Sequence, residues 1–160
     1  DVVNFEQIQR GHDAGEDEWV YMHRGLGIPD RTQTHADGTI TAPATDEVWK
    51  WSDRAANMLR SRGFEVISPY EHKLIGYTPV GIVNFDITLI EAVDYLLLNA
   101  DAPSWGAAME VRIAFDLDKP VVAFSANDTH SPWLTAHVKC VLPDLHKAVK
   151  YLCELAVEKS

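Results

Sequence analysis

The chain has 160 residues, 46% of them hydrophobic and 24% charged, and a formal net charge of -10 at pH 7. This length and composition suit one globular domain with a sizeable core. The acidic balance argues against binding of long nucleic acids, whose phosphates need a basic surface, whereas a small phosphorylated ligand needs only local positive groups.

Targeting and redox features are few. No apolar run approaches the length of a membrane span, and the first residues lack the basic and then apolar order of a signal peptide. The two cysteines, Cys140 and Cys153, cannot form a disulfide framework and are predicted to be small buried residues. We therefore expect a reducing, cytoplasmic environment and no membrane partner.

The amino-terminal part begins with residues 1–17, which are polar and interrupted by glycine. They predict a loosely docked extension to a single domain over residues 18–160. The first strand is expected at 19–23. The turn after it, Arg24-Gly-Leu-Gly-Ile-Pro-Asp-Arg31, carries two arginines and two glycines that could approach an anion, although solvated loop arginines fit equally well. Residues 32–44 contain an Asp37-Gly38 turn signal and could form a lid.

A helix is predicted from Thr45 up to Gly63, because acidic residues occupy its first turn and apolar residues recur at helical spacing. Its tryptophans fit core or dimer contacts. The second strand follows at 64–68. In the loop after it, Tyr70 could line a ligand pocket together with its neighbours His72 and Tyr77, or these side chains could pack as in any loop.

The next helix begins at Thr78-Pro79, where threonine fits the N-cap and proline the first helical position. Asp86 lies within its apolar face. A carboxylate directed at an apolar interior costs several kcal/mol unless it is paired or protonated, so it needs a partner or a task. Burial would raise its pKa, which suits a proton donor. The alternative is an aspartate at the edge of the apolar stripe that caps a neighbouring loop.

The most informative stretch is a strand at 95–98, a break at 99–103 and a helix that starts after Ser104. The strand is apolar without alternation, as in a parallel sheet buried on both faces. Ser104 fits an N-cap, so the helix N-terminus would face an anion beyond the strand's carboxyl end. The predicted apolar stripe is Ala107, Ala108, Val111, Ala114 and Phe115, with Gly106, Glu110 and Ile113 on a neighbouring face. An exposed helical Glu110 is the ordinary alternative.

The remaining elements complete an α/β pattern. Strands are expected at 120–124 and 140–142, a short helix at Ser131-Pro132, and a last helix from Pro143. Five strands alternating with helices predict a doubly wound five-stranded parallel sheet, with the flavodoxin-like order 2-1-3-4-5. The spacing of the histidines and cysteines near the carboxyl end (His130, His137, Cys140 and His146) matches no zinc motif, so we expect no metal.

The pattern Ser104-x-Gly106-x-x-x-Glu110, followed by Ala114 and Asp118-Lys-Pro-Val-Val, resembles the signature of the nucleoside 2-deoxyribosyltransferase superfamily. The resemblance extends more weakly over about residues 18–158. It implies that Glu110 is the nucleophile that attacks C1′ of a nucleoside or nucleotide. It also implies that Asp86 assists the departing base or orients the sugar, that no cofactor is needed, and that the partners are a small nucleoside or nucleotide and a second copy of the chain.

Individual residues of the motif indicate which substrate is expected. Superfamily members acting on free nucleosides carry aspartate where this chain has Ser104, and a hydroxyl at a helix N-terminus accepts a phosphate that a second carboxylate would repel. The motif therefore looks more like the nucleoside 5′-monophosphate N-glycosidases, including the CMP-hydrolysing enzymes. Arg112 departs from the glycine that relatives often have and could lie on the surface or narrow the pocket. In the resemblance the turn after the first strand helps to form the sugar and phosphate pocket, although relatives usually have small residues and then proline where this chain has His23, Arg24 and Gly25. The other expected substrate-binding residues are Gly106, His23, Arg24, Gly25, Arg31, Tyr70 and Ser131.

The predicted reaction is a two-step displacement in which Glu110 attacks C1′, the base leaves with help from Asp86, and water resolves the glycosyl-enzyme. By analogy with retaining glycosidases the two carboxyls should lie roughly 5 to 5.5 Å apart. Base exchange between deoxynucleosides is the first alternative, and a non-catalytic nucleotide sensor is the second.

Overall fold

The structure is a computed structural model that describes residues 18–24, 33–34, 36, 40–41, 50–68, 78–101 and 104–159. Within this part of the chain the main sheet has five strands in the order β4-β1-β5-β6-β7, and a separate two-stranded sheet pairs β2 with β3. The strands are β1 (Glu18–Arg24), β2 (Gln33–Thr34), β3 (Ile40–Thr41), β4 (Phe64–Ile67), β5 (Tyr95–Asn99), β6 (Val121–Phe124) and β7 (Cys140–Leu142).

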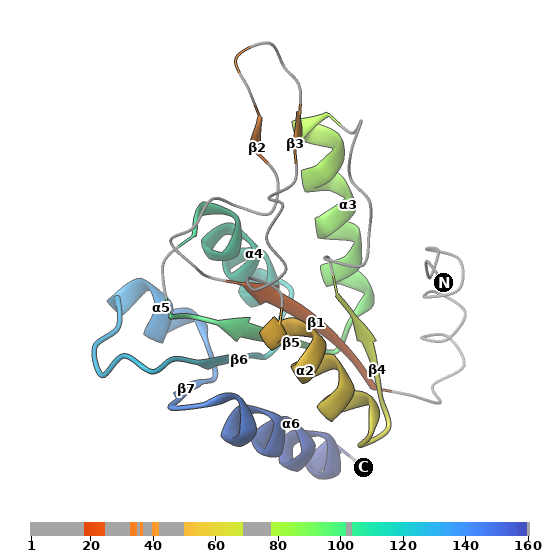
Figure 1. Ribbon diagram of the computed structural model, residues 1–160, viewed down its shortest axis with the longest axis vertical. Helices are drawn as coiled ribbons and strands as arrows, with labels where there is room; N and C mark the ends of the chain where they lie inside the picture. Colours follow the sequence, from red (N-terminus) through yellow and green to blue (C-terminus); the bar gives the residue numbers. More distant parts are fainter. Residues whose placement is uncertain are drawn as a thin grey trace.

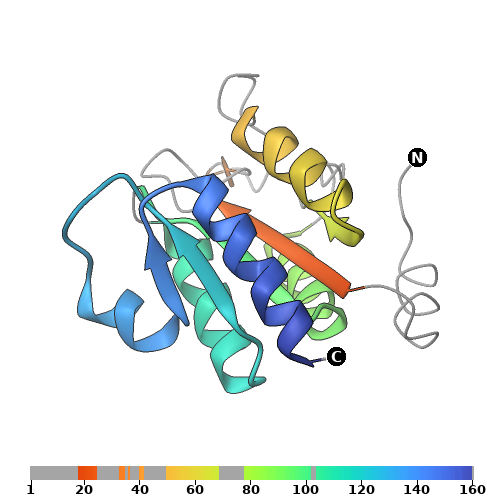
Figure 2. The ribbon, with the colours of Figure 1, turned by 90° about the horizontal axis from the view of Figure 1, so that it is seen from below.

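Helices cover both faces of the main sheet (Figures 1 and 2). They are α2 (Lys50–Arg60), α3 (Pro79–Ala92), α4 (Trp105–Asp116), α5 (Pro132–His137) and α6 (Leu145–Lys159). Each neighbouring strand pair of the main sheet is parallel. The predicted α/β fold with a parallel sheet is therefore confirmed. From β1 the strand order runs outward to β4 on one side and through β5, β6 and β7 on the other. The order therefore reverses between β1 and β5, and ligands of open α/β sheets bind at such a point.

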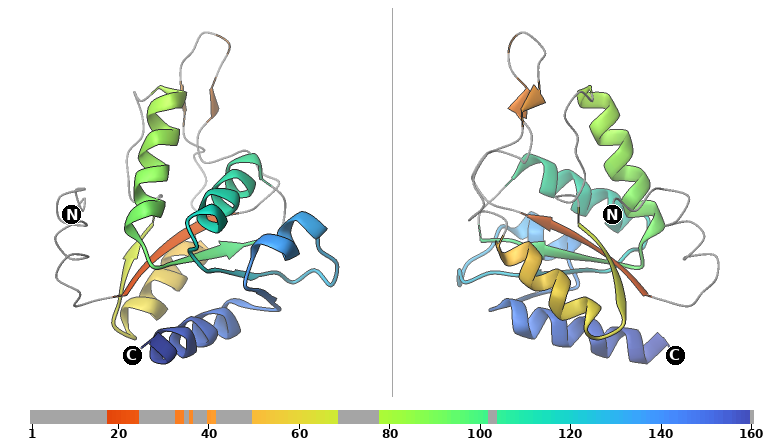
Figure 3. Two further views of the ribbon diagram at one scale, coloured as in Figure 1. Left: turned by 180° about the vertical axis from the view of Figure 1, so that it is seen from behind. Right: turned by 45° about the vertical axis from the view of Figure 1, so that its right-hand side comes forward.

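Two apolar clusters form the core, one on each face of the sheet. One joins α3 and α4 to residues of β5 and β6 such as Leu96, Leu98 and Val121. The other joins α2 and α6 to alternate residues such as Tyr95, Leu97 and Val122. All five residues of β5 are buried, as the unbroken apolar run predicts for a central parallel strand. The helices α3 and α4 thus share one face, which Figure 3 shows from two sides.

Side-chain caps set several helix boundaries. Thr78 and Ser104 accept hydrogen bonds from the backbone N–H groups of Gly81 and Ala107, so both predicted N-caps are confirmed. Ser131 caps α5 in the same way. After α2 the backbone turns at Gly63, whose φ of 87° lies in the left-handed region that glycine adopts without strain.

Several predicted boundaries and environments need correction. The last helix begins at Leu145 and not at Pro143, because the Asp144 carboxylate accepts a hydrogen bond at 2.8 Å from the Lys147 N–H and acts as its cap. Cys140 and Cys153 are free but only partly buried. The predicted extension 1–17 and the Asp37-Gly38 turn lie outside the described residues, although the strands on either side of that turn are paired antiparallel.

Candidate active site

The amino end of α4 lies at the carboxyl end of the central strand β5. The Ser104 Oγ accepts a hydrogen bond at 3.4 Å from the Ala107 N–H, and its backbone is extended, as in an N-cap residue. The unpaired N–H groups and the helix dipole make such an end favourable for an anion. The geometry that the sequence predicts for this turn is therefore present.

Glu110 lies one and a half turns into α4 and is 7% exposed, with its Oε2 atom buried. The buried face of the helix is Ala107, Glu110, Val111 and Ala114. The predicted apolar stripe was therefore wrong in part: Ala108 and Phe115 are exposed, and the helix is rotated so that Glu110 faces inward. The cause is that α4 packs against α3 as well as against the sheet. The alternative of a solvent-facing Glu110 is excluded.

Asp86 lies on the neighbouring helix, α3. Its side chain is half-buried, and its Oδ1 atom is buried. The helices α3 and α4 pack together and contribute to the same apolar cluster, with Phe85 and Ile113 at its edge. The two carboxylates that the sequence singles out therefore come from adjacent helices on one face of the sheet. The separation predicted for a retaining mechanism stays a prediction.

A polar brace at the ends of β5 and β6 was missed by the sequence analysis. Asn99 is 4% exposed, and its Oδ1 accepts a hydrogen bond from the Asp101 N–H at 3.1 Å. The Asp101 carboxylate accepts one from the Ala126 N–H at 2.8 Å, and its carbonyl accepts one from Asn127 Nδ2 at 2.8 Å. These bonds tie the turn before Ser104 to the loop after β6. The one available signal was the placement of polar residues directly after two apolar strands.

A pocket of about 500 Å³ opens between α4 and α5. Ser104 and Ser131, both predicted to bind substrate, line it together with Arg112, Trp133 and His137, over a floor that includes Leu98 and Val111. Glu110 and Asp86 are not among its lining residues. Ser104, the N-cap of α4, thus borders this pocket, whereas Glu110 is buried in α4 and does not line it.

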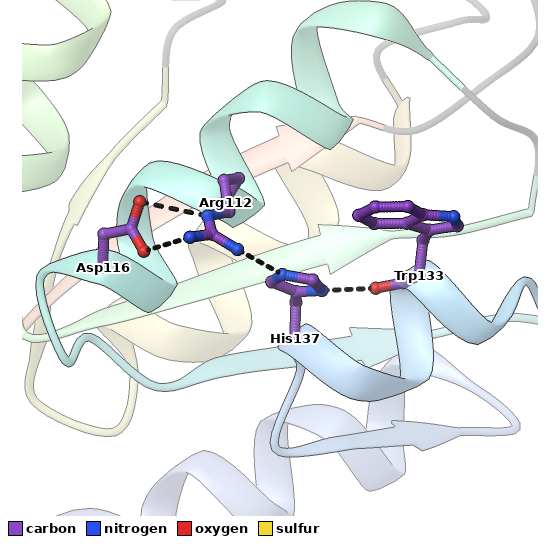
Figure 4. A network of polar contacts seen from close by, with 4 residues as sticks. All are labelled: Arg112, Asp116, Trp133 and His137. Carbon is purple, nitrogen blue, oxygen red and sulfur yellow. Dashed lines mark hydrogen bonds and ion pairs between the residues drawn. The ribbon is translucent and has the colours of Figure 1, made fainter.

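Arg112 lies on the surface and also lines this pocket, and its predicted effect on the substrate pocket stays a prediction. Its Nε and Nη2 contact the two Asp116 oxygens at 3.1 and 3.0 Å, and its Nη1 lies 3.2 Å from His137 Nε2 (Figure 4). His137 in turn contacts the Trp133 carbonyl. This network joins α4 to α5 on the face away from Glu110.

The other predicted binding residues are only partly described. His23 and Arg24 end β1, beside Leu98 and Asn99 of β5, and only their backbone is described. Gly106 lies in the first turn of α4 and is partly buried. Gly25, Arg31 and Tyr70 lie outside the described residues.

The described residues offer neither a metal site nor a membrane-spanning helix. In that part of the chain, no group of three or more His, Cys, Asp or Glu residues is arranged to hold a metal ion. None of its helices combines the length and apolarity that a bilayer crossing requires.

Comparison with known proteins places the fold. The chain resembles a 2-deoxyribosyltransferase of Bacillus psychrosaccharolyticus (19% identity, TM-score 0.58, covering 83% of this chain and 91% of that one). It also resembles the CMP N-glycosidase BcmB of Clostridium botulinum (12% identity, TM-score 0.55, covering 84% and 97%). A conserved protein from Enterococcus faecalis V583 is similar at 15% identity, with a TM-score of 0.53 over 84% of this chain and 87% of that one.

No protein-family sequence model matches the chain, and no curated protein matches it by sequence. The structural likeness spans nearly the whole length of both solved enzymes. The fold that the sequence resemblance implies is therefore the fold of the chain, and at these identities the likeness speaks for the fold alone.

Proposed function

We propose that the chain is an N-glycosidase that hydrolyses a nucleoside 5′-monophosphate to its free base and a (deoxy)ribose 5-phosphate. The observation that carries this proposal is Glu110, a carboxylate that is 7% exposed on a helix whose serine-capped N-terminus lies at the end of the central strand. A glutamate withdrawn from water at the end of the central strand is suitably placed for chemistry, and nucleophilic attack on a sugar is a role that carboxylates perform.

In the proposed first step, a Glu110 oxygen forms a bond to C1′ while the bond from C1′ to the base nitrogen breaks. The electron pair of that bond leaves with the base, and a proton from Asp86 neutralises the leaving nitrogen. In the second step, water attacks C1′, Glu110 leaves as a carboxylate, and Asp86 takes back the proton.

The preference for a monophosphate rests on Ser104. A hydroxyl at the N-terminus of α4 and the positive end of the helix dipole suit a phosphate dianion. Gly106 leaves room beside the helix for the sugar. His23, Arg24, Gly25 and Arg31 would approach from the turn after β1, which is the neighbour of β5, and Tyr70 would approach the base. Ser131 would add a second hydroxyl from the α4–α5 pocket.

Base exchange is the second candidate, since the fold is also that of a 2-deoxyribosyltransferase. The same glycosyl-Glu110 intermediate would then react with a second base instead of water. We further propose that the protein works in the cytoplasm. We also propose that it is a homodimer or larger oligomer, because three large apolar side chains are exposed: Trp105 and Met109 on α4 and Trp133 on α5.

The test is incubation of the chain with a panel of nucleosides and nucleoside 5′-monophosphates, with and without an acceptor base, followed by chromatography of the released base. We expect base release from monophosphates without an acceptor. Turnover of nucleosides but not of monophosphates would reject the proposal in favour of base exchange, and a Glu110→Gln variant with full turnover would reject the mechanism.

A further inference from the structure

Helix α5 is attached to the rest of the molecule by few contacts. It has six residues and none of them is buried. Leu134 packs at the edge of one apolar cluster, and the His137 ring meets the Phe115 ring of α4 at a centroid distance of 4.8 Å. A side-chain hydrogen bond between α4 and α5 joins Arg112 to His137. The position of α5 therefore depends strongly on His137.

The two hydrogen bonds of His137 define its protonation state. Its Nδ1 lies 2.7 Å from the Trp133 carbonyl oxygen, which only accepts, so Nδ1 carries a proton. Its Nε2 lies 3.2 Å from Arg112 Nη1, and a guanidinium only donates, so Nε2 presents a lone pair. Both contacts are satisfied only by the neutral imidazole with its proton on Nδ1 (Figure 4).

We propose that Arg112 and His137 form a latch that positions α5, and with it the wall of the pocket beside Ser104, only while His137 is neutral. Protonation of Nε2 would place a donor and a positive charge against the Arg112 guanidinium and break the bond. Arg112 cannot easily turn away, because Asp116 holds its Nε and Nη2 in a bidentate pair. Acidification therefore releases α5, and the role of the latch in substrate binding rests on the proposed function.

The charged groups around the His137 ring bear on whether its protonation releases α5. From α4, the charged groups near His137 in the described part of the chain are Arg112 and Asp116, and both Asp116 oxygens are already engaged by Arg112. On its own side of the contact, Trp133 stacks on the ring at 6.1 Å and carries no charge, and Lys139, two residues further on, adds a second positive charge.

The first experiment needs no activity and no variant. Nitrogen NMR of the uniformly labelled protein distinguishes the two neutral histidine tautomers. We expect His137 to be protonated on Nδ1 at about pH 8, and the amide signals of α5 to shift or broaden together with its titration as the pH falls to about 5.5. A neutral His137 protonated on Nε2, or α5 signals that ignore its titration, would overturn the latch.

The second experiment compares the KM for a 5′-monophosphate at the same two pH values in the wild type and in His137→Gln, whose neutral amide can still accept from Arg112. The titration of the phosphate, with a second pKa of about 6, affects both proteins alike. We expect the KM of the wild type to rise several-fold more than that of the variant, with a smaller change in kcat. Equal pH profiles would contradict the latch.

His146 supplies the matched control, because its Nε2 accepts from Arg54 at 2.9 Å in a similar contact far from this pocket. The His146→Gln variant should keep the pH profile of the wild type, and a changed profile in this variant alone would assign the effect to α6 and reject the latch. If no nucleotide or nucleoside is turned over at all, the proposed function fails, and the NMR result still decides the latch.

Discussion

At the residue scale, Glu110 is the most informative side chain. Its neighbours on the buried face of α4 are alanines and a valine, which fill little space beside the carboxylate. The sequence predicts its chemistry through the spacing from Ser104 and Gly106. Its burial could not be predicted, because the rotation of α4 depends on contacts with α3 that connect distant parts of the chain.

Asp86→Asn tests the proposed proton donor. The amide keeps the shape of the side chain but does not protonate a leaving base. We therefore expect kcat for a nucleoside 5′-monophosphate that the wild type hydrolyses to fall by about 100-fold or more. With an activated substrate, (deoxy)ribose 5-phosphate bearing a 4-nitrophenolate leaving group, the loss should be much smaller, because that group departs without a proton. Equal losses on both substrates would contradict the role of Asp86 as an acid.

The thiols give a prediction on pH. Burial raises the pKa of Cys140 and, in the same way, that of Cys153, with the positive charges of Lys139 and Arg62 opposing the respective shifts. A raised pKa leaves less thiolate at a given pH, so the native thiols should react with iodoacetamide several-fold more slowly than free cysteine at about pH 8. Mass spectrometry of the alkylated protein measures this, with the denatured chain as control. Reaction as fast as that of free cysteine would contradict the raised pKa of both thiols.

At the element scale, Lys119 joins the end of α3 to the turn after α4. Its ammonium donates to the carbonyls of Val93 at 2.7 Å and Glu91 at 3.1 Å, and the preceding Asp118 has a positive φ of 56°. A cation at a helix carboxyl end stabilises the last carbonyls and the dipole. This contact fixes α3 relative to α4, and so fixes the elements that carry Asp86 and Glu110.

Lys119→Ala should therefore lower the free energy of unfolding by about 1 to 2 kcal/mol, measured by urea denaturation. Lys150→Ala is the matched control, since its ion pair with Glu154 spans 3.9 Å between side chains that are 78% and 55% exposed. Such a pair contributes about 0.5 kcal/mol or less. Equal losses in the two variants would show that Lys119 does not hold α3.

Helices and strands could be predicted where neighbouring residues in the sequence encode them. The apolar run of β5, the caps at Thr78 and Ser104 and the short helix that starts at Ser131-Pro132 appear in the structure where the sequence places them. The brace between Asp101 and Asn127 and the contact between Arg112 and His137 were not predictable, because their partners are 26 and 25 residues apart. No local pattern encodes such pairs.

At the scale of the whole molecule, exposed apolar side chains are concentrated on one side. Trp105 is 84% exposed on α4, and Trp133, which lines the pocket between α4 and α5, is 76% exposed on α5. Monomeric proteins rarely expose a contiguous apolar surface of this kind. An isologous dimer would bury the same surface on both subunits.

Trp105→Glu should therefore shift the proposed dimer to monomer, as measured by light scattering during size-exclusion chromatography. Val157→Glu is the control, because Val157 is 74% exposed on α6, on the other face of the sheet. A monomeric wild type, or loss of the dimer in Val157→Glu alone, would contradict this use of α4.

The central claim is that a carboxylate of α4 becomes covalently bonded to the sugar. The direct measurement is rapid acid quenching during turnover of a nucleoside 5′-monophosphate, followed by proteolysis and mass spectrometry. We predict that the peptide containing Glu110 gains the mass of one (deoxy)ribose 5-phosphate less water, and that Glu110→Gln gains none. Base release with the sugar bound to another residue, or an adduct that persists in Glu110→Gln, would contradict the account.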